Sequence, residues 1–233
     1  MRPIELSLRL RTVAGLVPRQ ARFADVGTDH AYLPIWLLQR GWISEAIVSD
    51  LRQGPLERAK RNAERYGLTG SMSFRLGDGL APIAPDEVDV IAMAGMGGES
   101  IVEILAATPW MRWGSHRLIL QPMSALDELR RWLCLNGYCI EEELLCQDER
   151  LYTILSVTAG EMPDLTPAEC WAGRQTRDPL RGVLLDRLIL RAERALTGVQ
   201  KSTRPSDLPR QGELEQVYHG LKNMKEEWDS WQL

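Results

Sequence analysis

Acidic residues and glycines stand at the ends of four short apolar stretches. These are residues 25–30 (DVGTDH), Asp50, residues 77–79 (GDG) and residues 94–98 (AGMGG). A carboxylate can accept hydrogen bonds from both hydroxyl groups of a ribose, and glycines let a ligand approach the backbone closely. Together the four positions indicate a binding site for a nucleoside.

The first of these loops lacks the sequence of a phosphate-binding loop. Gly27 is followed by Thr28, Asp29 and His30, not by the glycines of a GxGxxG loop or by the Gly-Lys-Ser/Thr of a P-loop. Side chains there block the close backbone contacts that a pyrophosphate needs. We therefore expect a nucleoside with a tail that carries no phosphate, such as S-adenosylmethionine, and not NAD or FAD.

In this interpretation Gly27 makes room for the tail of the cofactor, Asp50 binds the ribose and Asp78 accepts a hydrogen bond from the adenine amino group. Each position has a plainer alternative. Asp50 would serve as a helix cap, Asp78 as a turn residue, and the glycines as parts of tight strand-to-helix turns.

The elements that must position these residues alternate between strands and helices. Strands are predicted at 22–26, 46–49, 72–76, 88–93 and 117–120, helices at 3–17, 34–40, 55–66, 100–107 and 126–135, and a terminal antiparallel hairpin at 138–145 and 151–157. This alternation predicts an α/β fold with a mainly parallel sheet. In such sheets ligands bind beyond the carboxyl ends of the strands, where the four loops would meet.

The composition changes near residue 160, which divides the chain into residues 1–160 and 161–233. Prolines predict an irregular segment at 161–179. Beyond it, apolar residues with heptad spacing over 185–199 and 214–231 predict an antiparallel coiled-coil hairpin joined by residues 200–212. The alternative is an ordinary helical subdomain without a function of its own.

Composition excludes several classes of protein. The formal net charge of −4 argues against a general nucleic-acid coat, although the first 22 residues hold five arginines and one glutamate. The apolar runs are too short to span a membrane, and the N-terminus has no apolar core of a signal peptide. The four cysteines form no CxxC pair. We expect a cytoplasmic protein with no membrane contact and no metal site.

The order of the motifs resembles the bacterial tRNA adenine-N1 methyltransferases of the TrmK type. The resemblance rests on residues 25–35 (DVGTDHAYLPI), 77–80 (GDGL), 94–98 (AGMGG), 120–122 (LQP) and, near the N-terminus, 6–10 (LSLRL). It covers residues 4–158 and implies a class I SAM-dependent methyltransferase with a Rossmann-like seven-stranded sheet, followed by a C-terminal coiled coil. It also implies transfer of a methyl group from S-adenosylmethionine to N1 of adenine 22 in tRNA. Similar proteins commonly have Glu where this chain has Asp50.

The motifs and the resemblance together define a candidate site. The candidate cofactor-binding residues are Arg9, Asp25, Gly27, Thr28, Asp29, His30, Asp50, Leu51, Gly77, Asp78, Gly79, Ala94, Gly95, Met96 and Gly97. Asp29 is also the candidate catalytic residue, because it would accept a hydrogen bond from the target adenine or offset the charge that develops there. Its alternatives are to cap the next helix or to bind the ammonium group of the cofactor.

Other interpretations stay open at this point. Arg9 would pair with the carboxylate of the cofactor or with a tRNA phosphate, or would be a solvated surface arginine. His30 would touch a ligand or simply pack against the turn. The chain as a whole could methylate another RNA or a small molecule, or be a catalytically silent RNA-binding scaffold. We expect a monomer with tRNA as its partner.

Overall fold

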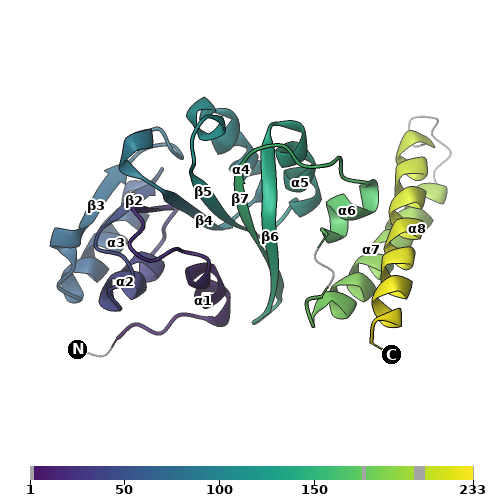
Figure 1. Ribbon diagram of the computed structural model, residues 1–233, viewed down its shortest axis with the longest axis horizontal. Coiled ribbons are helices and arrows are strands. Elements are labelled where there is room, and N and C mark those ends of the chain that lie inside the picture. The colour runs from purple at the N-terminus through teal and green to yellow at the C-terminus, as the bar shows by residue number, and fades with distance from the viewer. Residues whose placement is uncertain (1–2, 175–176, 202–207, 233) are drawn as a thin grey trace.

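A seven-stranded sheet forms the centre of the molecule (Figure 1). The computed structural model describes residues 3–174, 177–201 and 208–232. The strands are β1 (Phe23–Val26), β2 (Ala46–Asp50), β3 (Met72–Leu76), β4 (Val90–Met96), β5 (Arg117–Pro122), β6 (Tyr138–Gln147) and β7 (Leu151–Ala159). Their order is β3-β2-β1-β4-β5-β7-β6. The first five strands are parallel, and β7 runs antiparallel to both β5 and β6. The predicted α/β fold and terminal hairpin are confirmed.

Helices cover both faces of this sheet. They are α1 (Leu8–Gly15), α2 (Tyr32–Gln39), α3 (Gln53–Arg65), α4 (Gly98–Ala106) and α5 (Leu126–Leu135). Strand β4 shows how the two layers arise, because Val90 and Ala92 pack with the first three helices and the intervening Ile91 and Met93 pack with α4 and α5. Side chains of a strand alternate between faces, so one short apolar strand serves both cores.

The predicted helix at 3–17 is shorter in the structure. Helix α1 starts only after Ser7, whose hydroxyl oxygen accepts a hydrogen bond from the backbone N–H of Leu10 at 3.3 Å. The residues before it are extended, with Ile4 and Leu6 buried between exposed neighbours. Burial at every second residue is the pattern of extended backbone, and serine is a preferred helix cap.

Three further helices form the C-terminal part of the chain: α6 (Pro167–Ala172), α7 (Arg181–Gln200) and α8 (Leu208–Ser230). Helices α7 and α8 pack side by side through a seam that includes Leu185, Ala192, Val217 and Leu221, which confirms the helical hairpin (Figure 1). The middle of the predicted connector, residues 202–207, lies outside the described residues. None of the described helices combines the length and apolar character needed to cross a lipid bilayer.

The prediction of an irregular segment at 161–179 is wrong at α6. Thr166 caps this helix: its hydroxyl accepts the N–H of Glu169 at 3.2 Å, and the Glu169 carboxylate accepts the N–H of Thr166 at 2.7 Å. Pro167 takes the first helical position, where a missing N–H costs nothing. The sequence Thr-Pro-Ala-Glu thus contains a complete capping box. The prolines in this segment indicated irregular backbone instead.

Two buried arginines bind the end of α6, and one of them, Arg130, also joins this C-terminal part to the sheet. Arg130 of α5 donates to the carbonyls of Cys170 and Trp171 at 2.9 Å each, and to Glu143 of β6 at 2.7 Å. Arg181 of α7 donates to the carbonyls of Ala172 and Gly173. The last carbonyls of α6 would otherwise lack partners, so the two guanidinium groups satisfy the end of this helix from both sides.

We expect Arg130→Met to lower the free energy of unfolding by about 3–5 kcal/mol, because the Glu143 carboxylate is left buried and unpaired and two hydrogen bonds to backbone carbonyls are lost. Urea denaturation measures this. The adjacent Arg131 is the control: its ion pair with Glu213 is exposed, and Arg131→Met should cost less than about 1 kcal/mol. Equal losses for the two variants would contradict the role given to Arg130.

Candidate functional site

A cavity of about 540 Å³ opens at the carboxyl ends of β1 to β4. Eight of the predicted site residues line it: Gly27, Asp50, Leu51, Gly77, Asp78, Gly79, Gly95 and Met96. They come from four loops that are up to 69 residues apart in the chain, counted from 27 to 96. Parallel strands bring their carboxyl ends to one edge, and this edge gathers the motifs as expected.

The loop after β1 approaches the end of β4 closely at this edge. Gly27 has φ +74°, and a Cβ atom at this position would lie 3.1 Å from the sulfur of Met96. Its N–H donates to the carbonyl of Ser49 on β2 at 2.9 Å. A side chain at position 27 would be strained and would press on Met96, so the geometry explains the glycine.

Asp50 ends β2 and is buried at the cavity wall. Its Oδ1 accepts the N–H of Arg52 at 2.8 Å, a turn that leads into α3. Within the described residues no hydrogen bond engages Oδ2. The N-cap of α3 is Arg52, so Asp50 does not cap that helix, and its Oδ2 is left for the predicted role toward a ribose.

The turn after β3 packs tightly against α4. A Cβ atom at Gly79, whose φ is +52°, would lie 2.7 Å from Ile104. The N–H of Gly77 donates to the carbonyl of Asp50 at 3.1 Å, which ties this turn to the end of β2. Asp78 between the two glycines is exposed and lines the cavity. The glycines are needed for packing, and they leave the Asp78 carboxylate at the cavity.

Asp25 and Thr28 lie behind the cavity wall and do not line it. Both are buried, and burial raises the pKa of Asp25 to about 6, with Asp50 adding to the increase and a hydrogen bond from Thr28 opposing it. The Thr28 hydroxyl also accepts the N–H of Ala31 at 3.1 Å. These two side chains therefore hold the loop after β1 in shape, and they place a second acidic group beside Asp50.

Asp29 and His30 lie on the surface next to the cavity and do not line it. Asp29 forms an ion pair with Arg58 of α3, which lowers the pKa of Asp29, and one of its oxygens lies 3.2 Å from Nε2 of His30. The N-cap of α2 is Ala31, so Asp29 does not cap that helix. The predicted catalytic role of Asp29 stays a prediction.

Arg9 is not the solvated surface arginine of the plainer interpretation. Its guanidinium donates to Oε1 of Gln121, a fully buried residue of β5, and lies 5.5 Å from the ring centroid of Tyr152 on β7. A Cβ atom at Gly95 would lie 3.6 Å from the same guanidinium. Helix α1 thus brings a cation to the loop 94–98, which also contains Ala94 and, as the N-cap of α4, Gly97.

Sequence reasoning missed one wall of the cavity. It is formed by α4 and the turn after it, with Ser100, Glu103, Ile104, Thr108 and Trp110. The stretch 100–107 is predicted only as a helix; in the structure its Ile101 and Leu105 are buried in the core, and Ile104 also lines the cavity. The available signal was the polar pair Ser100 and Glu103, one turn apart on a helix whose later residues are otherwise apolar.

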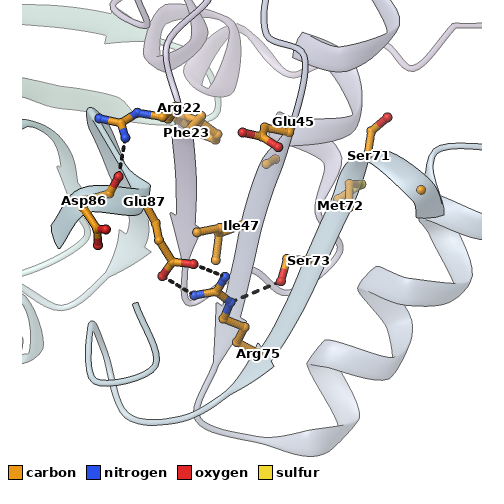
Figure 2. A pocket seen from close by; sticks show the side chains of 12 residues that line it. Arg22, Phe23, Glu45, Ile47, Ser71, Met72, Ser73, Arg75, Asp86 and Glu87 are labelled. Carbon is orange, nitrogen blue, oxygen red and sulfur yellow. Dashed lines mark hydrogen bonds and ion pairs between the residues drawn. The ribbon is translucent and has the colours of Figure 1, made fainter. Parts of the chain in front are cut away.

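A second groove, of about 440 Å³, lies at the opposite edge, where β1 to β3 begin (Figure 2). Both arginines that line it are paired: Arg75 contacts both oxygens of Glu87 at 2.7 Å, and Arg22 pairs with Asp89 and the carbonyl of Asp86. Such internal pairing leaves few charges for a ligand. The described residues also hold no cluster of three or more His, Cys, Asp or Glu placed to bind a metal.

Comparison with known proteins agrees with this geometry. Residues 6–155 match the family model described as "Methyltransferase domain". The chain is 42% identical over 162 residues to the tRNA (adenine(22)-N(1))-methyltransferase of Bacillus subtilis (strain 168), which covers 69% of this chain and 68% of that protein. This chain belongs to the tRNA (adenine(22)-N(1))-methyltransferase family.

Two solved structures extend the likeness to the C-terminal helices. The B. subtilis M1A22 tRNA methyltransferase TrmK is 30% identical with a TM-score of 0.86, over 95% of this chain and 99% of that chain. A Streptococcus pneumoniae protein, a putative tRNA (m1A22) methyltransferase in complex with S-adenosyl-L-methionine, is 35% identical with a TM-score of 0.78, over 92% and 100% of the two chains.

The buried carboxyl group of Asp25 should make stability depend on pH. Folded Asp25 keeps its proton up to about pH 6, whereas unfolded Asp25 loses it near its ordinary value of 3.8, so stability falls as pH rises between these values. The difference corresponds to about 3 kcal/mol at 1.36 kcal/mol per pH unit.

Asp25→Asn does not titrate and isolates this effect. Urea denaturation of both unliganded proteins from pH 4.5 to 7.5 should show the variant gaining stability relative to the wild type as pH rises, with a plateau above about pH 6.5. A constant difference across this range, or one of opposite sign, would show that Asp25 is not the group responsible.

Proposed function

We propose that this protein transfers a methyl group from S-adenosylmethionine to N1 of adenine 22 in tRNA. The observation that carries the proposal is the convergence of the family's motifs on one cavity of about 540 Å³ at the carboxyl edge of the sheet. The alternative of a catalytically silent scaffold finds no support, since Gly27, Asp50, Asp78 and Gly95 all line that cavity.

The cavity suits the chemistry of this cofactor. One oxygen of Asp50 would accept a hydrogen bond from a ribose hydroxyl and Asp78 one from the adenine amino group, and the side chains of Leu51, Met96 and Ile104 add apolar surface. Asp25, Asp50, Asp78 and Glu103 make the surroundings acidic, which favours a ligand with ammonium and sulfonium charges. When bound, the cofactor supplies an electrophilic methyl group.

The remaining candidates take supporting places in the proposal. Thr28, Ala94 and Gly97 would shape the loops around the cofactor. Arg9 lies beside Gly95 and would pair with the carboxylate of the cofactor. A monomer as the active form stays a prediction. The proposed substrate, tRNA, also supports a place of action in the cytoplasm.

For methylation at N1 the protein mainly has to position the adenine base, and proton transfer is less important. N1 of adenine has an in-plane lone pair, and the product is cationic near neutral pH, so no strong base is needed. The protein must hold the base in line, exclude water and stabilise the developing positive charge. Carbonyl groups of the 94–98 loop and the carboxylate of Asp29 are the candidates. Because N1 lies on the Watson–Crick edge, the nucleotide must be unpaired or flipped out.

The target can be tested with two unmodified transcripts of one tRNA, carrying A22 or G22, and S-adenosylmethionine labelled in its methyl group. We expect incorporation only into the A22 transcript, with 1-methyladenosine as the product after digestion. Incorporation into both transcripts would keep the methyltransferase and reject the site. Cofactor binding without incorporation into either would reject tRNA as the substrate.

Asp29→Ala should keep its affinity for S-adenosylhomocysteine and lose turnover by about 10²-fold, the scale expected when a group that stabilises transition-state charge is removed. Calorimetry and single-turnover rates separate the two effects. Arg58→Ala is the control, since it removes only the ion-pair partner of Asp29. Lost cofactor affinity with normal turnover at saturation would assign Asp29 to cofactor binding.

A further inference from the structure

The loop between β1 and α2, together with the first residue of that helix, presents two aromatic rings to solvent beside the cavity. His30 and Tyr32 stack with their centroids 5.1 Å apart and their planes within 9° of parallel. The His30 side chain is 41% exposed and Tyr32 is 42% exposed. Tyr32 is five residues from Gly27, which lines the cavity. Neither ring lines the cavity or belongs to the hydrophobic core, so packing within the chain does not account for the pair.

The loop is held in a backbone conformation that keeps these rings outside. Ala31 has φ +55°, which is unfavourable for any residue with a Cβ atom, and its N–H is bound by the Thr28 hydroxyl. Asn62 of α3 donates to the carbonyl of His30 at 2.9 Å. A left-handed alanine fixed from both sides indicates that the exposed position of the rings is built into the fold.

Helix α3 continues this surface with arginines. Arg58 and Asn62 face the loop, because they bond to Asp29 and to His30. Arg61 and Arg65 follow Arg58 by three and seven residues and therefore share its side of the helix. Both are exposed. In the part of the chain that the structure describes, neither forms an ion pair, whereas Arg58 does.

We infer that His30, Tyr32, Arg61 and Arg65 form a binding surface for unpaired nucleotides of the RNA substrate, next to the target adenine. Exposed aromatic rings stack on unpaired bases, and guanidinium groups bind the phosphates between them. The arginines give this surface a local positive charge. Such a charge favours RNA phosphates, although the chain as a whole carries a net charge of −4. The inference rests on the proposed function and adds the surface that would hold the RNA.

Stacking is tested with Tyr32→Ala and the conservative Tyr32→Phe. Binding of unmodified tRNA is measured in the presence of S-adenosylhomocysteine, so that no turnover is needed, and KM and kcat are measured separately. We expect Tyr32→Ala to raise the Kd and KM for tRNA about tenfold, with kcat and the Kd for S-adenosylhomocysteine within about twofold of the wild type. Tyr32→Phe keeps the ring and should restore tRNA binding.

A matched control removes an exposed aromatic ring elsewhere. Trp113 is 85% exposed and precedes β5, at the opposite edge of the sheet. Trp113→Ala should leave tRNA binding unchanged. Wild-type affinity for tRNA in Tyr32→Ala would overturn the inference. So would equal weakening in Tyr32→Ala and Tyr32→Phe, or a loss of S-adenosylhomocysteine affinity in Tyr32→Ala.

The arginines are tested by the salt dependence of tRNA binding. The double variant Arg61→Gln/Arg65→Gln should lower the slope of log Kd against log salt by about 1.5, as expected for two lost phosphate contacts. Lys60→Gln, on another side of the same helix, should leave the slope unchanged. An unchanged slope in the double variant would overturn the role of these arginines. Failure of the wild type to methylate A22 would reject the proposed function, whereas the binding measurements judge this surface separately.

Discussion

The position of β1 beside β4 is the constraint on which the rest of the structure depends. From β1 the chain passes through α2 to β2 on one face of the sheet, and from β4 it passes through α4 to β5 on the other face. The two connections leave in opposite directions, so the carboxyl ends of β1 and β4 are not covered by either helix. The cavity opens at this place, where Gly27 lies close to Met96. The role of each candidate residue depends on how close it lies to this cavity.

Residues in energetically unfavourable states also lie beside this cavity. Asp25 is buried with its pKa raised, Ala31 has a left-handed backbone, and Tyr32 is left exposed. Each feature would be easy to remove by a substitution that stabilises the folded chain, and all three lie within eight residues of one another. Unfavourable groups concentrated in one short segment, from β1 to the start of α2, are typical of functional sites, where stability and function compete.

The parts of the fold that depend on local pattern could be predicted from the sequence. Alternating apolar stretches predict the sheet, and because the carboxyl ends of parallel strands share an edge, Asp50 and Gly79 could be placed at one site from the sequence. Contacts between distant segments could not be predicted. Arg9 reaches Gln121, 112 residues away, and Arg130 reaches Cys170 and Glu143, through pairings that no local pattern records. Helix α6 could have been predicted, because its capping box is present in the sequence. The surrounding prolines, which are typical of irregular segments, point the other way.

The central claim is that a nucleoside binds at the carboxyl edge of the sheet with its ribose on Asp50. Calorimetry of S-adenosylhomocysteine binding to Asp50→Ala tests it most directly, with Glu45→Ala as the control because Glu45 lines the groove at the opposite edge (Figure 2). Loss of hydrogen bonds to a carboxylate, about 1.5–3 kcal/mol, predicts affinity weakened by about 10- to 150-fold in Asp50→Ala and unchanged in Glu45→Ala. Unchanged affinity in a folded Asp50→Ala protein, or weakening in Glu45→Ala instead, would contradict the account.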